Sequence, residues 1–201
     1  MPRAKVQRKS TSIDMTAMCD VSFLLLTFFI LTATARQPDP LEVTIPSSTY
    51  KFKVPDKDLA ILSIGKGKVF YEIVGQDIRK ATLDKMGDRY SIKFTPEQRE
   101  RFGVIGAFGV PMANLPAFID MSGEQRTKYL ETSKGIPTDS VNNQLSEWLL
   151  QSRNSVAELH QAQMRVTIRG DAQEEYPVVK KIVDILQKQK INKFSLITST
   201  E

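Results

Sequence analysis

An aspartate inside an apolar segment is the residue of this chain best placed to do chemistry. Asp20 is the only formally charged side chain between Ala17 and Ala35, where the sequence reads AMCDVSFLLLTFFILTATA. An ionised carboxylate in a bilayer costs about 2.5–3.5 kcal/mol on insertion scales, so such residues usually face a protein interior or a water-filled cavity. Loss of solvation disfavours the ionised form of a carboxyl group. Asp20 is therefore predicted to bind and release a proton.

Threonine hydroxyls lie near the same stripe of the expected helix as Asp20. Thr16, Thr27 and Thr34 recur at helical spacing on this face, with leucines between them. Their hydroxyls could bind water or a neighbouring helix, although threonine also bonds its own helix backbone. A lone helix cannot shelter a carboxylate, so the stripe predicts partner helices. The alternative is that Asp20 lies near the membrane interface and is solvated by headgroups and water.

The segment that carries Asp20 is long enough to cross a membrane. Its 19 residues span roughly 28 Å as a helix, at about 1.5 Å per residue. Four basic residues precede it and only Arg36 follows closely, so the positive-inside rule predicts a cytoplasmic N-terminus. Pro38 and Pro40 end the helix. The A-x-A triplet at 33–35 also fits a cleavable signal peptide, whose removal would take Asp20 with it.

The composition of the chain is that of an ordinary globular protein and excludes several classes of function. Of its 201 residues, 41% are hydrophobic and 25% charged. There is no basic patch with interleaved aromatic residues, which argues against nucleic-acid binding. Cys19 is the single cysteine and His160 the single histidine, so we expect neither a disulfide within the chain nor a metal site. His160 is expected on the surface of a helix. Motifs for phosphate binding or nucleophilic catalysis are absent, so no enzyme activity is expected.

Periodicity and turn signals after residue 57 predict an α+β domain with a small sheet. We expect strands at 59–64, 69–74, 164–169 and 194–198, with helices near 77–90, from Thr95-Pro96, at 122–130, within 138–160 and at 173–189. Residues 65–67 should form a hairpin turn, and Trp148 should lie in the core. Residues 103–120 are apolar but rich in glycine and proline, which favours a hydrophobic loop, with a partner-binding surface as the alternative.

Five short motifs, in a fixed order along the chain, together carry a resemblance to a known family. They are IDMTAMCDV at 13–21, LEVTIP at 41–46, MRVTIRGD at 164–171, YPVV at 176–179 and FSLIT at 194–198. They resemble the ExbD/TolR proteins, the small single-span subunits of proton-driven motors in bacterial inner membranes. In this resemblance Asp20 falls on the family's essential membrane aspartate. The match covers roughly 10–75 and 162–201, and the stretch between them is longer than in compact members.

The resemblance implies a division of the chain into four parts. Residues 1–14 would be a cytoplasmic tail, 15–36 a transmembrane helix that is kept in the mature protein, and 37–57 a periplasmic linker. Residues 58–201 would be a mixed α/β periplasmic domain, enlarged by a helical insertion at about 76–160.

It also implies a single-pass inner-membrane subunit of a motor driven by the proton motive force, with Asp20 as the proton carrier. The implied partners are an ExbB/TolQ-like polytopic protein, a TonB- or TolA-like transducer for outer-membrane transport, and a second copy of the chain; no cofactor is implied. Whether the system is of the TonB or the Tol type, and whether the domain contacts peptidoglycan, stay open. The alternative is a membrane-anchored or secreted periplasmic binding domain without proton coupling.

Overall fold

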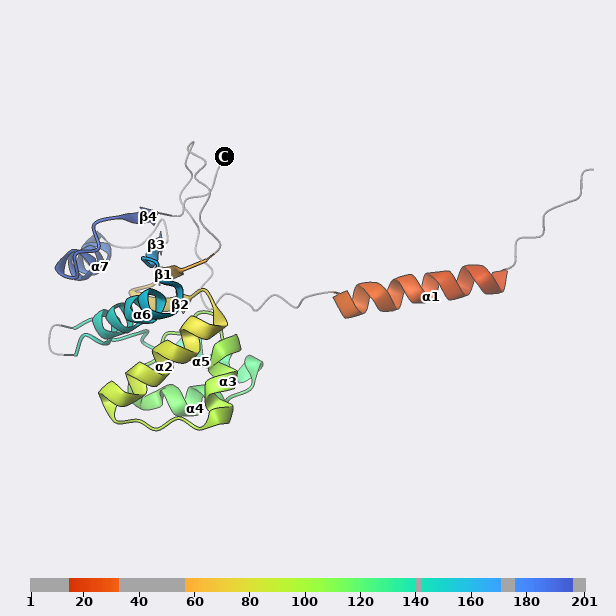
Figure 1. The fold of residues 1–201 in the computed structure, drawn as a ribbon, viewed down its shortest axis with the longest axis horizontal. Coiled ribbons are helices and arrows are strands. Elements are labelled where there is room, and N and C mark those ends of the chain that lie inside the picture. The colour runs from red at the N-terminus through yellow and green to blue at the C-terminus, as the bar shows by residue number, and fades with distance from the viewer. Residues whose placement is uncertain (1–14, 33–56, 140–141, 171–175, 197–201) are drawn as a thin grey trace, which may run out of the picture. The chain divides into compact units, whose positions relative to one another are not determined.

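A computed structural model describes residues 15–32, 57–139, 142–170 and 176–196 (Figure 1). The chain divides into two compact units, residues 1–37 and 38–201. In the first unit, helix α1 (Met15–Thr32) has 18 residues and is long and apolar enough to cross a membrane. The expected helix extended to residue 36, and residues 33–36 lie outside the described part. Most of the expected linker, 37–56, also lies outside it.

A four-stranded mixed sheet organises the second unit. Its strands are β1 (Leu59–Gly65), β2 (Lys68–Ile73), β3 (Arg165–Gly170) and β4 (Phe194–Leu196). The order is β2-β1-β3-β4, with β1 antiparallel to β2 and parallel to β3, and β3 parallel to β4 (Figure 1). Lys66 and Gly67 form the hairpin turn, both with positive φ, as a tight primed turn requires. The predicted mixed α/β domain with a small sheet is confirmed.

Strand β1 is central and supplies much of the core. Ala60, Leu62 and Ile64 alternate along it and are fully buried. Ala60 and Leu62 pair in register with Val166 and Ile168 of β3, so apolar side chains of neighbouring strands share one face. Strand β1 is therefore hydrogen-bonded to a neighbouring strand on each side.

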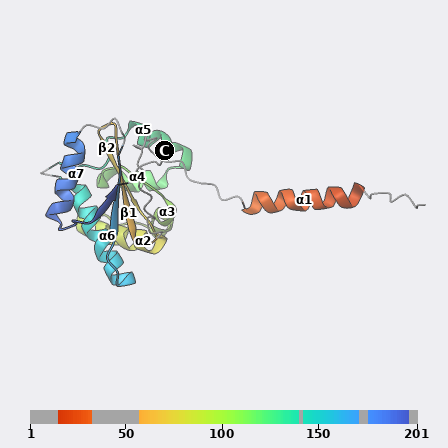
Figure 2. The ribbon, with the colours of Figure 1, turned by 90° about the horizontal axis from the view of Figure 1, so that it is seen from above.

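Helices fill the two crossover connections of the sheet. They are α2 (Gln76–Tyr90), α3 (Pro96–Val104), the 3-10 helix η1 (Met112–Asn114), α4 (Leu115–Asp120), α5 (Gly123–Thr132), α6 (Gln144–His160) and α7 (Tyr176–Lys188). Thr95 and Ser122 each form a capping box at the start of a helix expected from the sequence. Helices α6 and α7 lie side by side (Figure 2). There Gln189 Nε2, just after α7, donates to the Ser146 carbonyl in α6 at 2.6 Å.

The prediction of a loop at 103–120 is wrong for its second half and for its burial. Residues 112–120 are helical, and Phe108, Met112 and Phe118 are each 1% exposed. Phe108 exchanges two backbone hydrogen bonds with Tyr71 of β2, at 2.8 and 2.9 Å. A Cβ added at Gly109 would lie 2.3 Å from the Phe70 ring, so only glycine permits this approach. The segment therefore covers the outer edge of β2.

Aromatic side chains join the segment between β2 and β3 to the sheet. The Phe108 ring lies 4.8 Å from that of Trp148, 5.3 Å from Phe102 and 6.0 Å from Tyr71, centroid to centroid. The Tyr71 hydroxyl is 2.6 Å from the Ser152 hydroxyl of α6. Trp148 is fully buried, which confirms its predicted place in the core. The helices between β2 and β3 are thus part of the same core as the sheet.

Candidate functional site

Asp20 lies in the second turn of α1, with Thr16 and Thr27 near its side of the helix. The Thr27 hydroxyl donates to the Leu24 carbonyl of the same helix at 2.9 Å, so its proton is used locally. Its oxygen lone pairs can still accept a hydrogen bond from water or from another helix. Thr34, the fourth residue of the predicted stripe, lies outside the described residues.

The surface of α1 is apolar around this single carboxylate. No residue of the helix is buried in the chain, and its large apolar side chains range from Leu25, 52% exposed, to Leu31, 85% exposed. Two further hydroxyls follow the same pattern as Thr27, because Ser22 donates to the Met18 carbonyl and Thr32 to that of Phe28. The hydroxyl donors of Ser22, Thr27 and Thr32 are thus satisfied within the helix, which suits an apolar environment. Asp20 is the one charged side chain of α1.

A second cluster lies where the chain enters β1 in the second unit. The Asp58 carbonyl accepts a hydrogen bond from the Arg165 backbone N–H at 2.8 Å, and the Asp58 carboxylate bonds His160 Nδ1. His160 Nε2 is 2.8 Å from Asp77 Oδ2. One imidazole at the end of α6 therefore ties the start of β1 to the first turn of α2.

The two carboxylates favour the protonated imidazole. Hydrogen bonds to Asp58 and then to Asp77 raise the pKa of His160 above its ordinary 6.5. Partial burial acts to raise the pKa of Asp77, but the hydrogen bonds from His160 and from the Ile78 backbone together lower it. An imidazolium has two N–H donors and can serve both carboxylates at once.

The sequence predicted only that His160 lies on the surface of a helix. Its partners are 102 and 83 residues away in the chain, and no local pattern links them. In the described part of the chain, no group of three His, Cys, Asp or Glu side chains could hold a metal ion. The cluster is therefore an ion-pair network, and its effect should depend on pH.

We expect His160→Gln to destabilise the second unit most below neutral pH. The pKa of His160 is raised on folding, so its contribution is fully present below 6.5 and is lost as the pH rises through the raised folded value. The difference in urea midpoint between the wild type and the variant should therefore be largest near about pH 6 and should shrink by about pH 9. Urea unfolding of the full-length protein in detergent, followed by circular dichroism, measures this difference.

Glu158→Gln is the matched control. Glu158 lies in the same helix and pairs with Lys85 at 2.7 Å, so its substitution breaks an ion pair that contains no imidazole. Its effect on the urea midpoint should not change between the two pH values. A pH-independent effect of His160→Gln would contradict the ion-pair interpretation.

Comparison with known proteins adds one finding. A family model described as biopolymer transport protein ExbD/TolR matches residues 7–201. The matched range includes both Asp20 and all the helices between β2 and β3. Searches of the curated proteins and of the solved structures found no match.

Proposed function

The chain belongs to the ExbD/TolR family, and on this basis we propose that Asp20 is the proton carrier of its motor complex. Membership implies a stator subunit in biopolymer transport rather than an enzyme, with ExbB/TolQ and TonB/TolA proteins as partners. The observation that carries the proposal is the placement of one carboxylate in a largely apolar helix, α1, in which the Ser22, Thr27 and Thr32 hydroxyls donate to the helix's own backbone.

Proton binding at Asp20 gives the helix two states. The ionised carboxylate favours a polar cavity among partner helices, whereas the neutral form tolerates an apolar environment. One charge that crosses the membrane potential is worth about 2.3 kcal/mol per 100 mV. Alternate loading from the periplasm and release to the cytoplasm would therefore move α1 relative to its partners.

A pull on the chain before β1 would be transmitted to the whole sheet of the second unit. The chain enters it at β1, which pairs with β2 over Ala60–Gly65 and with β3 over Leu59–Ile64. Tension on Asp58 therefore loads the hydrogen bonds of two strand pairs together. This arrangement supports a role for the residues before β1 as the mechanical link to the periplasmic domain.

The proposed topology has a cytoplasmic N-terminus, a periplasmic second unit and two copies of the chain in the complex. The basic residues before α1 support this orientation. The outer edge of β2 is covered by Phe108, and Ile136 N–H also donates to the Val69 carbonyl at 2.9 Å. Among the described residues, β4 has no strand paired on its outer side, which leaves that edge for a second copy.

Co-expression with the ExbB/TolQ-like partner tests the proposal. The two proteins should purify as one complex with two copies of this chain by native mass spectrometry, and protease added outside spheroplasts should cleave after α1. Reconstituted vesicles that contain both proteins should conduct protons under an applied potential, and vesicles with this chain alone should not. Failure to associate, or flux that does not require the partner, would contradict the proposal.

A further inference from the structure

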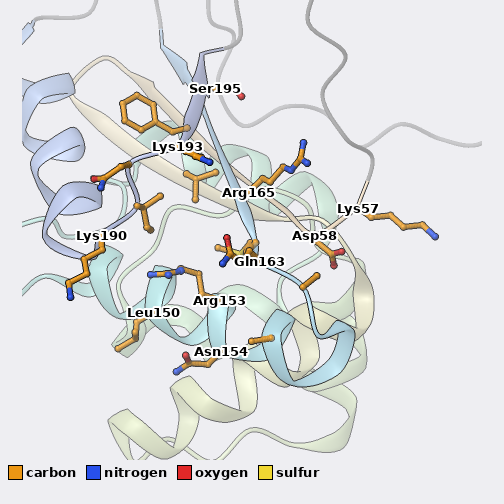
Figure 3. A pocket seen from close by; sticks show the side chains of 17 residues that line it. Lys57, Asp58, Leu150, Arg153, Asn154, Gln163, Arg165, Lys190, Lys193 and Ser195 are labelled. Carbon is orange, nitrogen blue, oxygen red and sulfur yellow. The ribbon is translucent and has the colours of Figure 1, made fainter.

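A groove of about 1220 Å³ lies at the amino ends of the three parallel strands of the sheet (Figure 3). Three chain segments that enter these strands form it, at 57–58 before β1, 162–166 into β3 and 190–195 into β4. One face of α6, around Arg153, completes it. Nothing proposed above for Asp20 involves this groove.

Basic side chains dominate the lining. Five cations border the groove: Lys57, Arg153, Arg165, Lys190 and Lys193. The single carboxylate in the lining is Asp58, which is already bonded to His160. Arg153 Nη1 donates to the Gln189 carbonyl at 3.1 Å, which fixes its guanidinium beside the groove. Within the described part of the chain none of the five forms an ion pair, so the groove offers an unneutralised positive potential.

The lining also offers apolar surface. Leu150, Met164, Ile191 and Phe194 line the groove together with the basic groups. Leu150 is 40% exposed and is one of three large hydrophobic side chains exposed in the described part of the second unit. Asn154, Gln163 and Ser195 add hydrogen-bonding groups that can serve a peptide backbone.

These features together define the class of ligand. The volume exceeds the roughly 300–1,000 Å³ of small-molecule sites, so a single metabolite or phosphate would leave much of it unfilled. A simple polyanion would meet the cations but would make no use of the apolar surface. We propose that this groove binds an acidic peptide segment of a partner protein, with apolar residues between its carboxylates. This binding requires no proton transfer, so it can be tested whether or not Asp20 carries protons.

The test uses the full-length protein in detergent micelles and a fluorescein-labelled peptide of about ten residues in which Glu and Leu alternate. Arg165→Glu combined with Lys193→Glu should weaken binding by about tenfold or more in fluorescence anisotropy, because two attractions become repulsions. Lys93→Glu combined with Lys134→Glu makes the same change in net charge at exposed residues outside the groove. That control should change the dissociation constant by less than about twofold.

Leu150→Ser tests the apolar part separately and adds no charge. It should weaken binding of the Glu–Leu peptide about threefold to tenfold and should not affect a polyglutamate peptide. Circular dichroism confirms that each variant is folded. If both double variants lose peptide affinity equally, net charge alone explains the effect and the proposal is overturned. The proposal is also overturned if polyphosphate binds as tightly as the peptide and Leu150→Ser leaves the affinity for polyphosphate unchanged. That result would assign the groove to polyanions in general.

Discussion

Asp20→Asn is expected to abolish function that depends on the proton motive force, down to the level of a deletion strain. Asparagine has nearly the same size and shape as aspartate, but it has no carboxylate to protonate. The substitution removes the only formal charge in α1, so the helix should insert at least as well as before. Growth on a substrate that requires energised outer-membrane uptake, or resistance to envelope stress, measures function. A blot of the membrane fraction measures abundance and length.

Two further variants make the Asp20 result specific. Asp20→Glu keeps the titratable group on a longer side chain and should retain part of the activity. Thr27→Val should retain most of the activity, because the Thr27 hydroxyl donates to its own helix at Leu24. Full function of Asp20→Asn, or a mature protein that lacks the α1 segment, would leave the alternative of a periplasmic binding domain without proton coupling.

Elements with local signals were predictable from the sequence. Thr95 and Ser122 precede their helices with the spacing of a capping box, and the structure contains both boxes. Alternating apolar residues around 59–64 and 164–169 predicted two strands that became neighbours in the sheet. The glycine at residue 67 marked the hairpin turn. In each of these the backbone conformation depends on residues only a few positions apart.

Features that depend on distant residues were not predictable. His160 meets Asp58 and Asp77 only in the folded domain, and the groove combines three chain segments with one face of α6. Residues 105–111 are irregular, because glycine and proline interrupt any period. Their burial is set by β2, whose Tyr71 pairs with Phe108. A segment without periodicity can therefore be core, and the sequence alone did not distinguish this from an exposed loop.

The largest effect on stability is expected for Phe108→Ala. The side chain is 1% exposed and its ring contacts those of Tyr71, Phe102 and Trp148. Truncation of a buried phenylalanine costs about 3–5 kcal/mol, from lost burial and from the cavity that remains. Small domains are stable by about 5–15 kcal/mol, so this is a large fraction of the total. Urea unfolding of the full-length protein measures the loss of stability. The fluorescence of Trp148, the single tryptophan, reports the transition.

Leu159→Ala is the control, because its side chain is 50% exposed and its loss should change stability by less than about 0.5 kcal/mol. An effect of Phe108→Ala as small as that of Leu159→Ala would restore the interpretation of 103–120 as a loop outside the core. The two variants of largest effect should also fail differently in cells. Phe108→Ala should lose function together with protein abundance, because unfolded protein is degraded. Asp20→Asn should lose function at normal abundance, and only that combination supports a chemical role for the carboxylate rather than a structural one.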